Sequence, residues 1–197
     1  MVLLGHTNRY AVVVNGTVKG HSEADFASAG YGMATPSGYR TALKLFNFAE
    51  RFSLAVVTLV DTVGAEPSFS AERAGQSEAI AGNLQKMASL RVPIISIIVG
   101  EGGSGGALGL MMGNSVGMLS CGWYGVISPE GAASILGRYK DDSHKKIQFP
   151  KDCAELAHVQ QIYVDQLLKK KVIDGIIWEE EDVVKSRENY TSFPQLN

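Results

Sequence analysis

The stretch Gly100–Gly113, "GEGGSGGALGLMMG", constrains the fold of this chain more than any other feature of its sequence. It directly follows the apolar run "VPIISIIV", and seven of its fourteen residues are glycine. Glycine loses more conformational freedom on folding than any other residue, so glycines gather where the backbone turns sharply or approaches another group closely. The stretch therefore predicts a buried strand, a tight turn and a short apolar helix, with some group held against bare backbone.

Two apolar runs, Leu54–Asp61 and Ile94–Gly100, lack the alternation of a strand that has one solvated face. Runs of this kind are typical of parallel strands that are covered on both faces. Further strand-like runs follow one another between residues 115 and 128, which differs from a plain alternation of one strand with one helix. The pattern predicts an α/β fold built from strand–strand–helix units.

Local signals predict the remaining elements. Asn15-Gly16, between two β-branched runs, predicts a type I′ hairpin. Thr35-Pro36 and Ser128-Pro129 each predict the capped start of a helix. The other expectations are one helix over residues 71–90, a short helix over Gly105–Met112, a polar loop over 140–151, one long helix over 152–171, a last strand over 172–179 and a tail over Asp182–Asn197.

The composition excludes several classes of function. The 197 residues suggest one domain, and a formal net charge of −2 gives no basic footprint for nucleic acid. Two cysteines, Cys121 and Cys153, are too few for a disulfide framework or a four-thiolate zinc site. No apolar run reaches the roughly 18 residues of a membrane span. We therefore expect no nucleic-acid partner, no membrane partner and no metal.

The glycine-rich stretch allows four interpretations. The first is that the glycines only let a helix pack closely on a strand. The second is a dinucleotide loop, because Gly100-x-Gly102-x-x-Gly105 matches that fingerprint after a strand and before a helix. However, the next strand-like run, "SVGMLSCGWYG", has no acidic residue to hold a ribose, and the match lies in the middle of the chain.

The third interpretation is a nucleophile elbow, because Ser104 is the central residue of a G-x-S-x-G pattern. Its possible downstream partners are Asp141, Asp142, His144 and His158. The fourth uses the backbone alone. N–H groups at a glycine-rich helix start point the same way, carry the positive end of the helix dipole, and can hold a developing oxyanion. This fourth arrangement needs no catalytic side chain, which suits a sequence without a convincing Cys/His or carboxylate pair.

Three segments carry a family resemblance: "VDTVGAE", "ERAGQSEAIAGNLQKMASLRVPIISIIVGEGGSGGALGL" and "YGVISPEGAASIL". In this order and spacing they closely resemble the carboxyltransferase α subunit of acetyl-CoA carboxylase, and "GYRTALKLFNFAERF" and "LLKKKVIDGIIWE" fit its flanks. The resemblance implies the crotonase fold, a spiral of strand–strand–helix (ββα) units. It implies a single domain over residues 1–181, shortened at its N-terminus relative to the family.

The resemblance also implies a reaction and its partners. In this family a carboxyl group moves from carboxybiotin, held on a biotin carboxyl carrier protein, to acetyl-CoA, and gives malonyl-CoA for fatty-acid synthesis. The α subunit shares its active site with a β subunit of the same fold. We therefore expect a hetero-oligomer with a β-type partner and α–α contacts, with biotin and a coenzyme A thioester at the site and no metal in this chain. The family occurs in the bacterial cytoplasm and the plastid stroma.

The same resemblance implies the site residues. The enolate of acetyl-CoA and the departing biotin anion both need hydrogen-bond donors already in place. The N–H groups of Gly105 and Gly106 are expected to form such an oxyanion hole, and a side chain at either position is expected to occupy the space of the ligand's carbonyl. Gly102 and Gly103 are expected to shape the approach, with Ser104 as a turn residue. A second helix start, formed by Ser128, Pro129, Glu130 and Gly131, is expected to line the site; the alternative is that it is only a capped helix start.

Three features remain open at this point. Glu101 either orients the glycine turn or is a solvated or capping carboxylate. Gln76 faces either a ligand or a partner subunit. A basic segment contacts either solvent or the phosphates of coenzyme A; it comprises Arg138, Lys140, Lys145 and Lys146.

The chain also departs from the family pattern. Where the family reads close to "IDTPGAYPG", this chain has "VDTVGAEPS", so Val63 replaces a stiffening proline and Glu66 replaces an aromatic residue. The family's basic run near the N-terminus is reduced here to Lys19 and a few other residues, so a clamp for coenzyme A phosphates would be weak. These departures favour a second hypothesis, a catalytically degenerate homologue that serves as a structural subunit. The two hypotheses differ in whether the glycine turn borders open space or is plugged, for example by Phe69.

Overall fold

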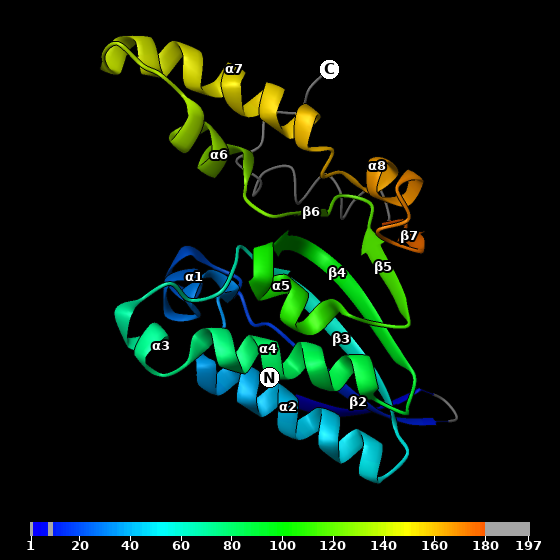
Figure 1. Ribbon diagram of the computed structural model, residues 1–197. Helices are drawn as coiled ribbons and strands as arrows, with labels where there is room; N and C mark the ends of the chain where they lie inside the picture. The colour runs from blue at the N-terminus through cyan, green and yellow to red at the C-terminus, as the bar shows by residue number, and fades with distance from the viewer. Residues whose placement is uncertain (1, 8–9, 180–197) are drawn as a thin grey trace.

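A single sheet of seven strands organises the part of the chain that the computed structural model describes, residues 2–7 and 10–179 (Figure 1). The strand order is β1-β2-β3-β4-β5-β7, and β6 pairs separately with β4. The β1–β2 pair is antiparallel, whereas the remaining pairs are parallel. The strands are β1 (Val2–Thr7), β2 (Tyr10–Gly16), β3 (Ala55–Thr62), β4 (Ile94–Gly103), β5 (Ser115–Leu119), β6 (Trp123–Gly125) and β7 (Gly175–Ile177).

The predicted helix starts are confirmed by their caps. Thr35 accepts a hydrogen bond from the Gly38 N–H at the start of α2, and Ser128 accepts one from the Gly131 N–H at the start of α6. Each cap satisfies one of the amides that a helix start leaves without an intrahelical partner. The helices are α1 (Glu23–Ser28), the 3₁₀ helix η1 (Gly30–Gly32), α2 (Pro36–Arg51), α3 (Phe69–Arg73), α4 (Gln76–Ser89), α5 (Ser104–Met111), α6 (Pro129–Leu136), α7 (Asp142–Gln160) and α8 (Val164–Lys169).

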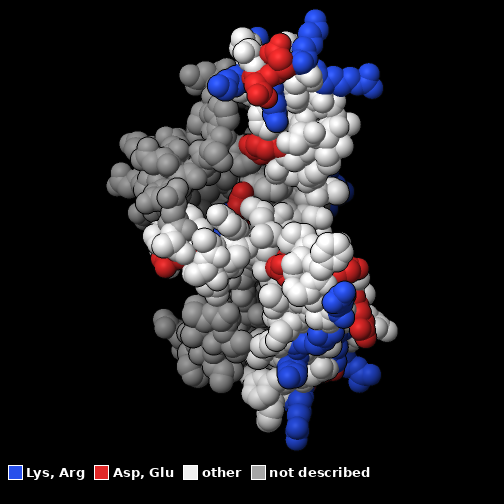
Figure 2. All heavy atoms as spheres, turned by 90° about the vertical axis from the view of Figure 1, so that its left-hand side faces the viewer, with Lys and Arg blue, Asp and Glu red and all other residues white. Residues whose placement is uncertain are grey.

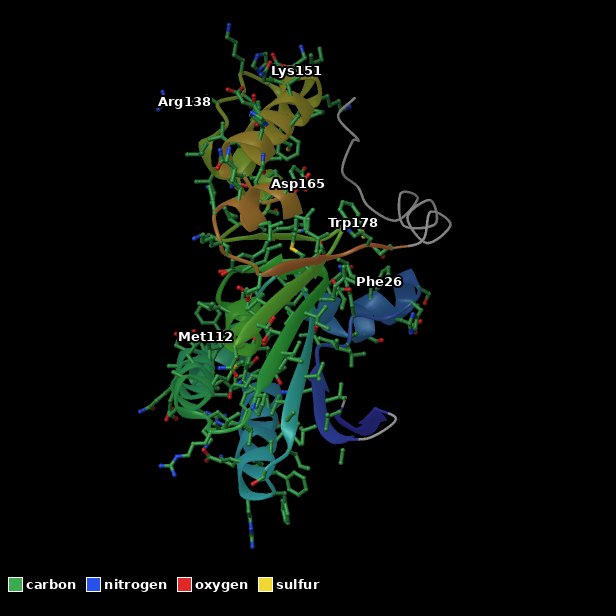
Figure 3. All side chains as sticks on the ribbon, turned by 90° about the vertical axis from the view of Figure 1, so that its right-hand side faces the viewer. Phe26, Met112, Arg138, Lys151, Asp165 and Trp178 are labelled. Atoms are coloured by element: carbon green, nitrogen blue, oxygen red, sulfur yellow. The ribbon has the colours of Figure 1, made fainter. Side chains whose placement is uncertain are left out.

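Helices α2, α4 and α5 cover one face of the sheet, and the main core lies between them and the strands (Figures 1 and 3). Every second residue of β3 is buried toward these helices, and Tyr39 and Phe46 of α2 are fully buried against them. The other face is less covered than the apolar runs predicted. Val57 and Leu59 are only partly buried there, and Ile95 is 45% exposed. The parallel strands are therefore as predicted, but their second face keeps apolar surface.

The predicted hairpin at Asn15-Gly16 is wrong. Both residues belong to β2, where they pair in parallel with Thr58 and Leu59 of β3. The antiparallel partner of β2 is β1, which precedes it. The turn preference of an Asn-Gly pair is a local effect, and here the ladder of hydrogen bonds with a distant strand outweighs it.

Three helix boundaries also differ from the prediction. The helix expected over 71–90 is divided at Gly75, whose φ of +80° ends one helix and starts another. Residues 142–151, expected in a loop, are the first part of α7, because Asp141 caps the His144 N–H and the helix continues through Pro150. The helix expected over 152–171 is divided at Gln161, which has a φ of +54°. The expected tail, Asp182–Asn197, lies outside the described residues.

Candidate active site

The glycine-rich stretch forms a strand-to-helix turn without any intervening loop. Strand β4 ends at Gly103, and α5 begins at Ser104, which has a φ of +54°. A left-handed conformation is uncommon for a residue with a side chain, and such strain concentrates at functional sites. Because the N-cap residue is Gly103, no side chain caps the first turn of α5. The first-turn amides, those of Ser104, Gly105 and Gly106, therefore resemble those of an anion-binding helix start.

The glycines of this turn have different surroundings. A Cβ atom on Gly105 would meet nothing within 4 Å, so this position borders open space. A Cβ on Gly106 would lie 2.2 Å from the carbonyl carbon of Gly64, and one on Gly103 would lie 2.1 Å from the carbonyl oxygen of Val63. The expectation that a side chain at Gly106 would enter ligand space is therefore wrong. Gly103 and Gly106 are glycine because α5 and the end of β4 pack directly on backbone.

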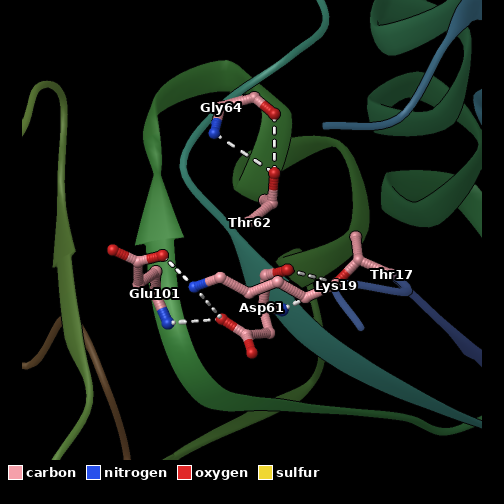
Figure 4. Close-up of polar contacts among 6 residues, drawn as sticks. All are labelled: Thr17, Lys19, Asp61, Thr62, Gly64 and Glu101. Atoms are coloured by element: carbon pink, nitrogen blue, oxygen red, sulfur yellow. Dashed lines mark hydrogen bonds and ion pairs between the residues drawn. The ribbon is translucent and has the colours of Figure 1, made fainter. Parts of the chain in front are cut away.

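The backbone at this contact belongs to residues 62–65, the last residue of β3 and the three that follow it, which we call the 62–65 loop. The Thr62 hydroxyl donates to the Gly64 carbonyl oxygen at 2.6 Å and accepts from the Gly64 N–H at 3.2 Å (Figure 4). The next amide, that of Ala65, has no acceptor in the described part of the chain. Its nitrogen lies 2.4 Å from the position of a Cβ on Gly106, so it lies beside the first turn of α5. Ala65 was not among the site residues expected from the sequence, although it belongs to "VDTVGAE", one of the segments that carry the resemblance.

One departure from the family pattern, Glu66, has a local structural role. At the other, Val63, the loop is held by the bonds between its neighbours Thr62 and Gly64. The Glu66 carboxylate accepts hydrogen bonds from the Ser68 N–H and hydroxyl, at 3.2 and 2.9 Å. The Gln76 amide is 5% exposed and donates to the carbonyl oxygens of Ala34 and Glu66. Gln76 therefore links the segment after the loop to the residues before α2. Phe69, the suggested plug, is 89% exposed and points its ring to solvent.

A hollow of about 350 Å³ lies next to this region, between the end of β2, η1 and the start of α2. Tyr39 and Leu110 form part of its wall. Tyr39 is fully buried, and its hydroxyl donates to the Gly106 carbonyl oxygen at 2.9 Å. Tyr39 thus joins α2 to α5, so the wall of the hollow is continuous with the helix that carries the glycine turn.

Replacing Tyr39 by phenylalanine is expected to reduce the free energy of unfolding by about 0.5–1.5 kcal/mol, because it removes one buried hydrogen bond to the Gly106 carbonyl. Burial raises the pKa of Tyr39. The unfolded chain ionises this phenol near pH 10, whereas the folded chain keeps the proton, so the wild-type protein loses stability as the pH rises above about 10. Urea unfolding from pH 8 to 11 should show a weaker alkaline decline for Tyr39→Phe. The half-exposed Tyr31, replaced in the same way, is the control.

The second helix start lies at the same edge of the sheet. Strand β6 pairs with the end of β4 so that Gly103 is opposite Gly125, and α6 begins shortly after β6. The Ser128 hydroxyl accepts a hydrogen bond from the Gly131 N–H at 3.1 Å. Pro129 is buried and Glu130 is partly exposed. The structure thus places Ser128–Gly131 one strand away from the glycine turn, as the capped start of a helix.

The partners of a nucleophile elbow are not brought to Ser104. Asp142, His144 and His158 lie on α7, and Asp141 is its N-cap. Helices α6 and α7 pack against each other on the far side of β6 from α5 (Figure 1). Ser104 therefore has the backbone of an elbow without the histidine that would activate it.

The basic segment lies at the outer end of the α6–α7 hairpin. Figure 3 labels Arg138, which lies in the segment between α6 and α7, and Figure 2 shows acidic side chains mixed with the basic ones in this part of the molecule. The Lys145 ammonium lies 5.9 Å from the ring centres of both Tyr139 and Phe149. Among the described residues on the face that Figure 2 shows, the basic side chains of this end are interspersed with acidic ones.

Within residues 2–7 and 10–179, no group of three or more His, Cys, Asp or Glu side chains is arranged to hold a metal ion. In the same residues no helix combines the length and the apolar character needed to cross a membrane.

Comparison with known proteins places the chain in a family. A family model described as acetyl co-enzyme A carboxylase carboxyltransferase-like matches residues 1–193. The acetyl-coenzyme A carboxylase carboxyl transferase subunit alpha of Nitrosomonas eutropha is 46% identical over 88% of this chain and 51% of its own length. That of Fusobacterium nucleatum is 47% identical over 84% of this chain and 50% of its own length. The chain thus spans about half the length of the curated relatives it matches.

Solved structures share the fold at low sequence identity. The transcarboxylase 12S core matches 95% of this chain and 36% of its own, with a TM-score of 0.74 and 18% identity. A Pseudomonas malonate decarboxylase heterodimer matches 96% of this chain and 77% of its own, with a TM-score of 0.69 and 19% identity. The predicted crotonase-like α/β fold is confirmed by these neighbours. Because the family model covers nearly the whole chain and the curated relatives are α subunits, this chain belongs to the α-subunit family of acetyl-CoA carboxylase carboxyltransferases.

Proposed function

We propose that this chain acts as a carboxyltransferase α-type subunit, which moves a carboxyl group from carboxybiotin to acetyl-CoA and gives malonyl-CoA. One observation carries the proposal. The uncapped start of α5 borders open space at Gly105, and the Ala65 N–H beside it has no protein acceptor among the described residues. A purely structural subunit has no need of amides that face an unfilled space.

The N–H groups of Gly105 and Gly106 are the proposed oxyanion hole, and the Ala65 N–H is a third donor beside them. Donors of this kind are already oriented, so they stabilise charge as it develops on the thioester oxygen without reorganising. Gly102 and Gly103 shape the turn by letting the end of β4 pack closely on β6 and on the backbone of Val63, and the strained Ser104 then starts α5. The helix start formed by Ser128, Pro129, Glu130 and Gly131 lines the neighbouring side of the site.

The residues present fit the groups that the family uses. The open position at Gly105 is the space that a thioester or ureido oxygen needs within reach of the amides. Carboxybiotin, brought by a biotin carboxyl carrier protein, supplies the carboxyl group. This chain binds the reacting oxygen, keeps it oriented against α5, and offers backbone donors rather than a metal.

The open side of the turn supports a site that a second chain completes, because carboxyl transfer needs water to be excluded from its reactive groups. We propose a β-type carboxyltransferase subunit as that chain, within a hetero-oligomer that also contains α–α contacts. Residues 1–181 form the carboxyltransferase domain in this proposal, and residues 182–197 form its tail. The bacterial cytoplasm or the plastid stroma is the proposed location.

A reverse-direction assay tests the proposal. The chain is purified with the partner that accompanies it in its native source, and malonyl-CoA-dependent carboxylation of free biotin is measured. We expect transfer by the complex and none by either chain alone. A stable complex that transfers nothing would instead identify the chain as a structural subunit.

A further inference from the structure

The Lys19 ammonium contacts two carboxylates of the protein, whereas a phosphate-binding lysine presents its ammonium to a ligand. Lys19 lies on the segment after β2, and its ammonium contacts the Glu101 carboxylate and lies 3.3 Å from Oδ1 of Asp61 (Figure 4). The three side chains are 22%, 24% and 29% exposed for Lys19, Glu101 and Asp61. The ammonium is therefore engaged inside the protein at the carboxyl ends of β3 and β4.

Asp61 is the centre of this network. Its Oδ1 also accepts the Glu101 N–H at 2.9 Å. The Thr17 hydroxyl donates to its carbonyl oxygen and accepts from its N–H, both at 2.8 Å. A Cβ on Gly100 would lie 2.7 Å from Oδ1, so the carboxylate fits only against bare backbone. Asp61 directly precedes Thr62, so these bonds fix the point from which the 62–65 loop departs.

The charges of the network require the lysine. Two carboxylates, those of Asp61 and Glu101, share one ammonium, and all three groups are mostly withdrawn from water. Like charges in such surroundings repel strongly, and a partly buried carboxylate without a counter-ion is unfavourable. Without the ammonium, the carboxylates are expected to move apart, and the backbone that carries them would move with them.

We propose that Lys19 is a positioning residue, the internal counter-ion of Asp61 and Glu101 that holds the 62–65 loop against the first turn of α5. Through that loop it sets the place of the Ala65 N–H. Its effect on catalysis rests on the proposed function, whereas its effect on the loop does not.

Hydrogen–deuterium exchange of the full chain tests the proposal directly. The Glu66 amide reports the position of the loop, because its acceptor is the Ala34 carbonyl oxygen outside the loop, and the Gly64 amide, which donates to the Thr62 hydroxyl, reports the internal order of the loop. Lys19→Met is expected to speed their exchange at least about tenfold, and Lys19→Arg to leave it close to wild type. Lys44→Met, at an exposed lysine of α2, is the matched control and should change nothing.

A charge-restoring double variant separates electrostatics from packing. In Lys19→Met with Glu101→Gln, Asp61 is the one carboxylate of the pair that remains, and the repulsion between like charges is removed, so exchange should be clearly slower than in Lys19→Met. The proposal is overturned if Lys19→Met exchanges like wild type, or if the double variant exchanges as fast as Lys19→Met.

Transfer kinetics give a second, separate measurement. Lys19→Met is expected to lower kcat roughly tenfold with the KM for malonyl-CoA nearly unchanged, as a displaced amide donor would. A raised KM with kcat unchanged would show that Lys19 binds coenzyme A phosphate and would overturn the positioning role. Absence of transfer in the wild type would contradict the proposed function, and the exchange experiment would still decide the role of Lys19.

Discussion

Replacing Gly106 by valine is expected to reduce the free energy of unfolding by about 3 kcal/mol or more. The added Cβ would lie 2.2 Å from the Gly64 carbonyl carbon and 2.4 Å from the Ala65 nitrogen. These are backbone atoms, and the Thr62 hydroxyl and the Gln76 amide hold their loop in place. Neither partner can yield as a flexible side chain would, so α5 and the loop must separate. Urea denaturation, followed by far-ultraviolet circular dichroism, measures the loss.

Gly105→Val is the matched control, since it adds the same side chain at the adjacent position in the same helix turn. Its Cβ would meet nothing within 4 Å. If both variants unfold at the same urea concentration, the close approach of α5 to the 62–65 loop is not what fixes Gly106.

Gly105→Val is also the variant with the largest expected effect on activity. We expect it to lower carboxyl transfer by roughly 10²-fold or more, the range seen when one oxyanion-hole donor is lost. The physical reason is steric, because the side chain would fill the open space from which an acyl oxygen reaches the amides of α5. Stability should change by less than about 1 kcal/mol, because valine and glycine differ little in helix propensity and no protein atom is displaced. The measurement is malonyl-CoA-dependent transfer to biotin by the complex with its partner, together with its unfolding curve.

Gly105→Ala tests the same steric effect on transfer with a smaller side chain. It should retain more transfer than Gly105→Val and should be at least as stable as wild type, since alanine favours helix over glycine. Full transfer by Gly105→Val would show that the space beside this residue is not used by a substrate, and the oxyanion-hole proposal would fail. Equal losses of transfer and of folding would instead make Gly105 a packing residue.

The two glycines show where sequence reasoning succeeded and where it reached its limit. The pattern "GEGGSGGALGLMMG" predicted the order strand, turn, helix, and the structure has β4 ending at Gly103 and α5 beginning at Ser104. The same pattern gave Gly105 and Gly106 the same role. Gly105 and Gly106 differ because the loop after β3 packs against Gly106 and not against Gly105. The residues near Gly106 in the sequence do not predict that contact.

The errors in the predicted elements have a related cause. Asn15-Gly16 has a strong local turn signal, but β3 pairs with these residues in parallel and keeps them extended. Residues 142–151 read as a loop because they are polar, yet they form part of α7, which packs on α6. At Asn15-Gly16 a contact distant in sequence outweighed a local preference worth about 1 kcal/mol or less, whereas at residues 142–151 the Asp141 cap and the packing on the neighbouring helix outweighed the polar composition.

The sequence by itself determined the family, the α/β class, the parallel strands and the position of the glycine turn. Each of these follows from side-chain periodicity or from residues adjacent in the chain, so it can be read locally. Only the tertiary structure decided that Gly105 faces open space while Gly106 faces backbone, that the Ala65 amide lies beside them, and that the Lys19 ammonium contacts the carboxylates of Asp61 and Glu101. Each of these contacts joins residues from different elements among β2, β3, β4 and α5. Such residues are far apart in the sequence and meet only when the chain is folded.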